Sequence, residues 1–261
     1  MAWTERQRLM LAEMGLTVWA PQGEAGDADA VEASLMEADV STAPPMEAKV
    51  ATAAAAEPSP MRASGPALLP VAEMDWPALR QAVAQCQACR LCESRRNTVF
   101  GIGHERAHLM VVGEAPGEQE DRKGEPFVGP AGHLLDSMLR ALGLTREPAE
   151  AERQVFIANT LKCRPPGNRN PEPDEMVKCE PYLKRQLALV QPRVILAMGR
   201  FAVQALLRSS EPIGRLRGRV HQYEGVPLVV TYHPAYLLRN LPDKAKAWDD
   251  LCLAGSLLGG K

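Results

Sequence analysis

Four short apolar runs stand out along the chain, at 109–112, 155–158, 194–197 and 228–230. Each run gives way to glycine or polar residues, and the segments between the runs carry apolar residues at helical spacing. Continuous apolar runs of this length are typical of parallel strands that are covered on both faces. The pattern therefore predicts an α/β domain built on these four strands.

Helical and hairpin patterns account for much of the remaining sequence beyond residue 75. We expect helices at 76–86, 132–143, 172–190, 200–208 and 243–258. Residues 217–222 and 226–232 are expected to form two strands, because the Glu224-Gly225 pair between them is typical of a tight hairpin turn.

Polar side chains follow three of the four expected strands at the point where each strand ends. Glu114 lies in the turn after the first strand, Asn159 follows the second, and His233 follows the fourth. Because open α/β sheets bind ligands beyond the carboxyl ends of their strands, we expect these three side chains to converge on one crevice. The turn at 113–117 has neither a Gly-x-Gly-x-x-Gly nor a Walker pattern, so it does not indicate a nucleotide cofactor.

Each of these residues also has an ordinary structural explanation, as does Phe127 in its Pro/Gly-rich loop. Phe127 could pack in the core, or it could offer a stacking face to a flat ring. Asn159 could be a turn residue, or its amide could pair with the N3–H and O4 of uracil. His233 could cap a turn, or it could donate a hydrogen bond to a leaving oxygen.

Six cysteines occur, and four of them fall into two separated pairs. Cys86 and Cys89 form a C-x2-C motif, while Cys163 and Cys179 form a C-x15-C pair. Separated thiol pairs indicate a metal site, and four thiolates suit either zinc or an iron–sulfur cluster, between which the spacing does not choose. The alternative is that all six cysteines are small buried hydrophobic residues.

Charge and composition divide the chain near residue 75. Residues 1–74 carry 4 Lys/Arg against 11 Asp/Glu, whereas residues 75–261 carry 26 against 21. We expect a short amphipathic segment at 1–20, a disordered Ala/Pro/Glu-rich linker at 21–74, and the folded domain at 75–261. The mildly basic balance of that domain is compatible with a polyanionic partner, but many neutral enzymes share it.

No apolar run approaches the ~20 residues of a membrane span, and the N-terminus lacks the pattern of a signal peptide. The cytoplasm is therefore the expected location. In that compartment cysteines serve as metal ligands or buried thiols rather than as disulfides. We interpret Cys92 and Cys252 as non-ligands.

Four motifs, GEAPGEQED, PFVGPAG, NTLKCRPPGNRNP and HPAYLLRN, occur with the two cysteine pairs in a characteristic order. Over about residues 80–258 the chain resembles family 4 of the uracil-DNA glycosylases, the iron–sulfur-containing class. The resemblance implies a three-layer α/β/α sandwich with a central four-stranded parallel sheet. It also implies an enzyme that flips uracil out of single- or double-stranded DNA and hydrolyses its N-glycosidic bond, leaving an abasic site.

The resemblance further implies roles for individual residues. The 4Fe–4S ligands would be Cys86, Cys89, Cys163 and Cys179, and the uracil contacts would be Glu114, Ala115, Pro116, Phe127, Asn159 and His233. Asn159 and His233 are also the main catalytic candidates. Ala115 stands where an acidic, water-activating residue could have been, so that role is expected of Glu114 or Glu120.

Contacts with DNA are expected from one loop and from scattered arginines. Residues 233–239 would form the loop that inserts into DNA, where an apolar wedge fills the gap left by the flipped base. Its candidate contacts are Tyr236, Leu237, Leu238 and Arg239, although either leucine could instead belong to a helix core. Candidates for phosphate contacts are Arg217 and Arg219, together with Arg164, Arg169 and Arg215.

Two other functions compete with this interpretation. A sibling glycosylase that traps uracil-containing DNA covalently would need a histidine after the second strand motif, and residues 164–169 contain none. A non-catalytic iron–sulfur DNA-binding adaptor would have a degraded pocket, whereas Phe127, Asn159 and His233 are all present. We expect a monomer, in which residues 4–19 either dock on another protein or fold back on the domain.

Overall fold

The computed structural model describes residues 70–259, so the expectations for residues 1–20 and for most of the 21–74 linker lie outside it. The described part begins slightly before residue 75. A short 3-10 helix, η1 (Val71–Glu73), precedes Met74, whose carbonyl oxygen accepts a 2.5 Å hydrogen bond from Arg185. Met74 itself is buried, so the fold includes these residues.

A sheet with the strand order β1-β3-β2-β4-β6-β5 lies at the centre of the described residues. The four inner strands are β2 (Leu109–Gly113), β3 (Phe156–Asn159), β4 (Val194–Met198) and β6 (Val226–Thr231). Neighbours among these four pair in parallel, as the apolar runs predict. All four therefore end at the same edge of the sheet.

The two outer strands correct the expectation of a purely parallel, four-stranded sheet. β1 (Ile102–Gly103) pairs antiparallel with β3, and β5 (Val220–Tyr223) pairs antiparallel with β6. β1 is too short to leave a hydrophobic pattern in the sequence. The hairpin of β5 and β6 is confirmed, and both Glu224 and Gly225 in its turn have positive φ angles of 47° and 84°.

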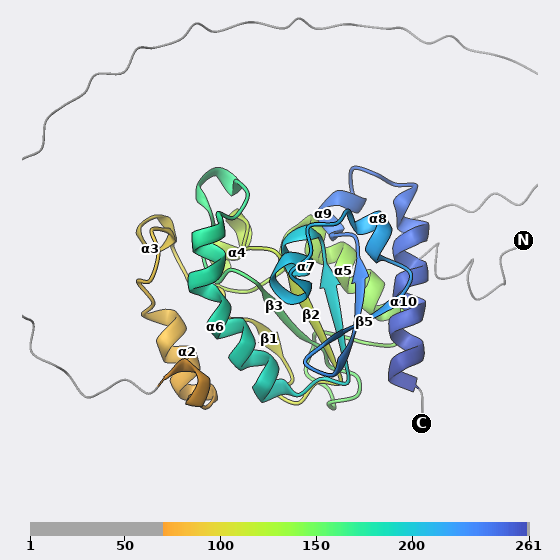
Figure 1. Cartoon of the computed structure of the whole chain (residues 1–261), viewed down its shortest axis with the longest axis horizontal. Coiled ribbons are helices and arrows are strands. Elements are labelled where there is room, and N and C mark those ends of the chain that lie inside the picture. The colour runs from red at the N-terminus through yellow and green to blue at the C-terminus, as the bar shows by residue number, and fades with distance from the viewer. Residues whose placement is uncertain (1–69, 260–261) are drawn as a thin grey trace, which may run out of the picture. The chain divides into compact units, whose positions relative to one another are not determined.

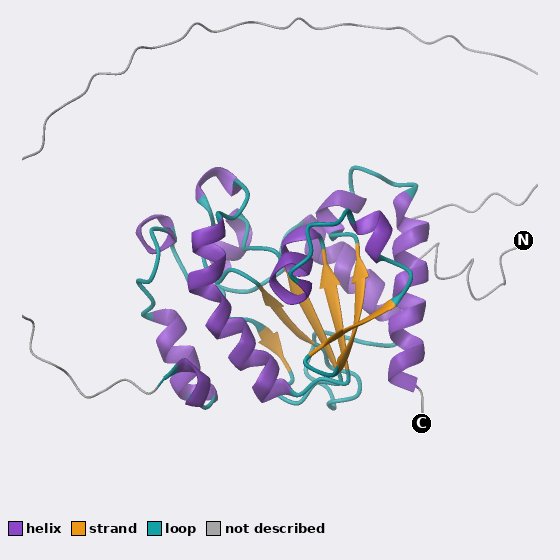
Figure 2. Ribbon diagram, viewed as in Figure 1, coloured by secondary structure: helices purple, strands orange, loops and turns teal. Residues whose placement is uncertain are grey.

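Helices cover both faces of the sheet, which makes a three-layer α/β/α fold (Figures 1 and 2). One face packs against α5 (Pro130–Ala141), the short α9 (Pro234–Leu237) and α10 (Asp243–Gly259). Leu109 and Val111 of β2 point into this layer.

The opposite face packs against α6 (Pro173–Val190), α7 (Arg200–Leu207) and the short α8 (Ile213–Leu216). Met110 and Val112, which alternate with Leu109 and Val111 along β2, point into this second layer. α2 (Trp76–Ala84) contacts α6. No helix among residues 70–259 is long and apolar enough to cross a membrane.

The five helices expected from the sequence are present with ends shifted by a few residues. Among residues 70–259, six short helices were not expected, namely η1, α8 and α9 together with α3 (Leu91–Ser94), α4 (Glu118–Lys123) and the 3-10 helix η2 (Pro166–Asn168). Each is six residues or fewer, so none is long enough for its apolar residues to show a helical period.

Candidate active site

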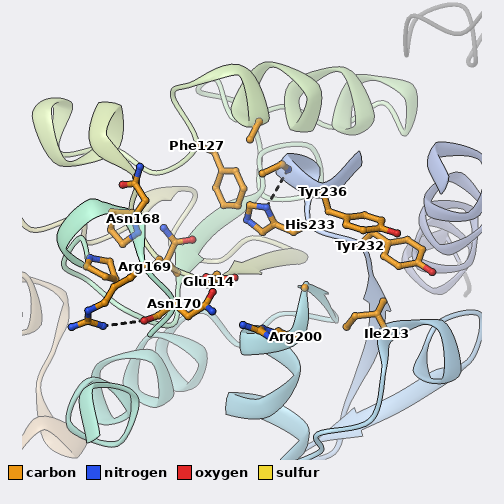
Figure 3. Close-up of a pocket in the computed structure, with 18 of the residues that line it drawn as sticks. Glu114, Phe127, Asn168, Arg169, Asn170, Arg200, Ile213, Tyr232, His233 and Tyr236 are labelled. Atoms are coloured by element: carbon orange, nitrogen blue, oxygen red, sulfur yellow. Dashed lines mark hydrogen bonds between the residues drawn. The ribbon is translucent and has the colours of Figure 1, made fainter. Parts of the chain in front are cut away.

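A pocket of about 1130 Å³ opens at the carboxyl ends of β2, β3, β4 and β6 (Figure 3). It brings together ten of the residues singled out from the sequence. These are Glu114, Ala115, Pro116, Glu120, Phe127, Asn159, Arg169, His233, Tyr236 and Arg239. The convergence expected from the strand ends is therefore present.

Asn159 and Phe127 meet over Gly113, the last residue of β2. A Cβ atom at Gly113 would lie 2.4 Å from Asn159 Oδ1 and 2.7 Å from the Phe127 ring, so glycine is needed for both side chains to lie there. Asn159 is buried, and its Oδ1 has no hydrogen-bond partner within residues 70–259. A buried amide oxygen without a partner is costly unless a ligand supplies one.

Phe127 is held in an unusual backbone conformation beside His233. Its φ of 54° lies in the left-handed region, which a bulky residue rarely adopts. The two rings stack with centroids 5.4 Å apart and planes 27° from parallel, and Figure 3 shows them side by side. Gly132 permits this turn, because a Cβ atom there would lie 1.7 Å from the Phe127 carbonyl oxygen.

His233 is held in a defined tautomer at the start of α9. Its Nδ1 accepts a 3.2 Å hydrogen bond from the Ala235 backbone N–H, so the proton of the neutral ring lies on Nε2. Burial lowers the pKa of His233 to about 4, with Glu120 acting against this shift and Arg239 adding to it. At neutral pH the ring is thus an uncharged donor through Nε2.

The Glu120 side chain forms hydrogen bonds with the backbone of two loops that line the pocket. Its Oε2 accepts from the backbone N–H of Gly117 at 3.1 Å, and its Oε1 accepts from Val128 at 3.0 Å and Gly129 at 3.2 Å. Both carboxylate oxygens are therefore occupied by backbone groups. This arrangement argues against the expectation that Glu120 activates water and assigns it to positioning the loop that carries Phe127.

Glu114 is the other candidate for that role, and its surroundings differ. Burial raises the pKa of Glu114, while the positive charge of Arg200 opposes the shift. The backbone carbonyl of Glu114 accepts from the Thr160 hydroxyl and from the Leu161 N–H, which ties the turn to the segment after β3. Its carboxylate makes no hydrogen bond with any other residue of the described chain, so it faces the pocket unengaged.

The expected DNA-inserting loop needs one correction. Leu237 is 0 % exposed and packs in the core with α5 and α10, so it cannot contact DNA. Leu238 and Leu241 are 41 % and 52 % exposed. Sequence reasoning missed Leu241, which lies just beyond the motif, whereas Arg239 is exposed at the pocket as expected.

Arg217 is also placed differently from the expectation. Its Nε donates to the fully buried Asp250 carboxylate at 3.0 Å, and its Nη2 donates to the Lys246 carbonyl. Arg217 therefore joins the segment before β5 to α10 and is not free to bind phosphate. Arg219 is exposed but does not line the pocket. Arg200 does line it and was missed, although it begins the helix directly after β4.

Four cysteine thiols line a second, small cavity, here called the cysteine cavity. Cys86 and Cys89 lie between α2 and α3, Cys163 follows β3, and Cys179 lies in α6. Cys92 does not line this cavity, which agrees with its interpretation as a non-ligand. Cys252 lies far along the chain, on α10.

The cysteine cavity offers four sulfur donors from Cys86, Cys89, Cys163 and Cys179. Four thiolates are a donor set that suits either zinc or an iron–sulfur cluster. Burial raises the pKa of Cys179 to about 12, so this thiol needs a bound cation to lose its proton at neutral pH.

Lys162 joins the cysteine cavity to the active-site pocket and was not noticed in the sequence. Its side chain is 1 % exposed, and its Nζ donates to the Asn159 carbonyl at 2.8 Å and to Gln186 Oε1 at 2.6 Å. Its backbone N–H donates to Cys179 Sγ at 3.3 Å. The backbone of Asn159 is thereby fixed to the wall of the cysteine cavity.

Comparison with known proteins finds a family model and several relatives that match this chain. A model of the uracil DNA glycosylase superfamily matches residues 100–252. A type-4 uracil-DNA glycosylase of Archaeoglobus fulgidus is 42% identical over 187 residues, covering 69% of this chain and 91% of that protein. One of Thermotoga maritima is 41% identical over 162 residues, covering 61% and 81%. A type-5 uracil-DNA glycosylase of Pyrobaculum aerophilum is 34% identical over 149 residues, covering 53% and 66%.

Proposed function

This chain belongs to the uracil-DNA glycosylase superfamily, and we propose that it is a DNA-repair hydrolase that excises uracil from DNA. The base is flipped out of the strand, its N-glycosidic bond is hydrolysed, and an abasic site remains. One observation carries the proposal for the pocket. Asn159 presents a buried, unpartnered Oδ1 beside an aromatic ring and a neutral histidine, as a site for a flat, polar base requires.

Asn159 and Phe127 would recognise the flipped base. The amide of Asn159 accepts from the N3–H of uracil through Oδ1 and donates to O4 through Nδ2. Cytosine has an amino donor at position 4 and an acceptor at N3, so the same amide would meet mismatched groups. Phe127 offers its ring to the face of the base, and its loop is braced by Glu120.

His233 and Glu114 would act on the bond that breaks. Negative charge develops on the uracil ring as the bond lengthens, and the Nε2–H of neutral His233 donates to O2. The sugar becomes positively charged and is captured by water. Glu114 is the carboxylate that faces the pocket, so it would stabilise that charge and orient the water.

The rim of the pocket would hold the DNA strand. Flipping a base out of duplex DNA costs a few kcal/mol, part of which an inserted apolar side chain offsets. Leu238 and Leu241 are exposed on either side of Arg239 in the sequence and would supply such a wedge. Arg239 and Arg200 line the pocket and would neutralise phosphates next to the uracil.

The cysteine cavity would hold a 4Fe–4S cluster through Cys86, Cys89, Cys163 and Cys179. The four thiols line one cavity and come from three parts of the fold, which supports this assignment. The cluster supplies a metal cross-link between these parts. Anaerobically purified protein should contain about four irons per chain, whereas stoichiometric zinc without iron would exclude the cluster.

The pocket assignment is tested by uracil release from single-stranded and double-stranded DNA under single-turnover conditions. Asn159→Ala and His233→Ala should each slow the chemical step by about 10²–10³-fold. His133→Ala is the matched control, because the exposed His133 is not part of the pocket lining and should change the rate little.

Rates within threefold of the parent for Asn159→Ala or His233→Ala would show that the pocket is misassigned. DNA binding by the parent without uracil release would instead favour the adaptor. A covalent protein–DNA product would favour the trapping enzyme.

A further inference from the structure

Arg95 reaches from the end of α3 into the cysteine cavity. Its Nη1 donates to Cys163 Sγ at 3.0 Å. Its Nη2 donates to the backbone carbonyl of Cys86 at 2.7 Å and to that of Ala84 at 3.5 Å. One side chain therefore contacts two of the cysteines assigned to the cluster, and these two come from distant parts of the sequence.

The fork of the guanidinium suits this double contact. Its two terminal nitrogens hold donors in one rigid plane, so fixing one nitrogen on the Cys86 carbonyl also fixes the other against Cys163. A lysine could reach only one of these acceptors with comparable geometry. Arg95 thus sets the separation between the segment after α2 and the segment after β3.

Charge gives Arg95 a second effect. Four thiolates bring four negative charges into a cavity whose lining includes three cationic side chains, Arg95, Lys162 and Lys178. Lys178 pairs with Asp174 at 2.8 Å, and the Nζ of Lys162 is directed to Asn159 and Gln186. Arg95 is the cation of these three whose side chain donates to a cysteine sulfur.

We propose that Arg95 is a positioning residue of the iron–sulfur site, which holds Cys86 and Cys163 in place and raises the reduction potential of the cluster. This inference rests on the cluster proposed above. A hydrogen bond to a ligand sulfur and a nearby positive charge both favour the more negative, reduced cluster. Holding two ligands at a fixed separation slows the loss of iron.

Three variants of the full chain, prepared anaerobically, test the proposal: Arg95→Met, Arg95→Lys and Arg96→Met. Arg96 is the matched control, because it is the next residue and its side chain is exposed. The measurements are iron per chain, the reduction potential by spectroelectrochemical titration, and the rate of iron release to a chelator. A merely structural residue would change the release rate without moving the potential.

Arg95→Met should shift the potential to a more negative value and release iron about 10–100-fold faster than the parent. Arg95→Lys keeps the charge, so its potential should lie close to that of the parent while iron release stays fast. Arg96→Met should match the parent in all three measurements. The Arg95→Met variant could be isolated without iron. In that case the proposal is supported if the Arg95→Lys variant releases iron faster than the Arg96→Met variant.

Two results would overturn the inference, and they differ from each other. Iron-loaded Arg95 variants with the potential and release rate of the parent would show that Arg95 does nothing for the cluster. A parent protein without iron would remove the cluster itself, while uracil release by that protein would leave the pocket assignment intact.

Discussion

In the proposed reaction, the single proton on His233 decides how this residue interacts with the departing base. A neutral ring donates through Nε2 without placing a full positive charge next to a departing anion and a positive sugar. Its burial between Phe127 and the start of α9 keeps it neutral, and the Ala235 N–H fixes the tautomer. The donor is therefore ready before DNA binds.

This state of His233 makes stability depend on pH in a defined direction. The folded-state pKa is about 4, against an ordinary value of 6.5. Between these values the unfolded chain binds more protons than the folded one, so the free energy of unfolding falls as pH drops through that window. Between pH 7 and pH 4.5, the free energy of unfolding of the His233→Gln variant should fall by about 2 kcal/mol less than that of the parent, as measured by urea unfolding.

Long-range proton–nitrogen NMR checks the same point directly. It should show the Nε2–H tautomer of His233 at neutral pH and titration near the folded value. A midpoint near 6.5 would contradict the burial argument and would leave a charged ring at the pocket in mildly acidic solution.

At the residue scale, the sequence predicts which side chains converge but not every role. Glu114, Asn159 and His233 are predictable because strand ends of a parallel sheet meet at one edge. The roles of Glu120, Leu237 and other residues depend on partners that only tertiary contacts supply. Arg217, for example, is committed to Asp250, which lies on a helix 33 positions further along the chain.

Among the elements, the link between α4 and the Phe127 loop matters most for the pocket. Glu120→Ala leaves three backbone N–H groups without their acceptor and should reduce kcat by about 10–100-fold, because Phe127 is no longer held in position. Glu120→Gln keeps one side-chain oxygen for Val128 and Gly129, so it should retain most of the activity. Single-turnover uracil release measures both, and Glu118→Ala is the control on the same helix.

If Glu120 were a general base, the Glu120→Gln variant would lose activity as the Glu120→Ala variant does. If Glu120→Gln is as slow as Glu120→Ala, the carboxylate itself takes part in the reaction and the positioning role is wrong. The pH profile gives a second check, because a positioning residue leaves its shape unchanged while a base does not.

Whether a helix or strand can be predicted from the sequence depends on its length and on how much of it is buried. The four inner strands and five longer helices leave a clear period or a continuous apolar run, and all are found. β1 is missed because it is two residues long. α9 is missed because four residues after a His-Pro pair cannot be told from a turn.

For the molecule as a whole, the Arg217–Asp250 pair joins α10 to the hairpin side of the sheet. Asp250 is 0 % exposed and also accepts from the Gly218 N–H at 3.0 Å. Asp250→Ala would remove the buried carboxylate to which Arg217 and the Gly218 N–H donate, at a cost of about 3–5 kcal/mol. The melting temperature should fall by about 10 °C, as a thermal scan would show.

Asp249→Ala is the matched control for this prediction. The Asp249 carboxylate lies 3.8 Å from Arg217 with 70% of its side chain exposed, so its removal should have little effect. Equal melting temperatures for the two variants would mean that the buried pair is not a principal contact of the fold.

During synthesis on the ribosome, the segments that form this pocket emerge in a fixed order. β2 with Glu114, the Phe127 loop and β3 with Asn159 are synthesised first, whereas β6, His233 and α10 follow all of them. Until β6 emerges, β4 has no neighbour on one side and the layer that α10 covers stays open to water, which exposes the nascent chain to aggregation. A chain interrupted before His233 would keep Phe127 and Asn159, which we propose recognise the base, and would lack the residue that we propose helps it leave.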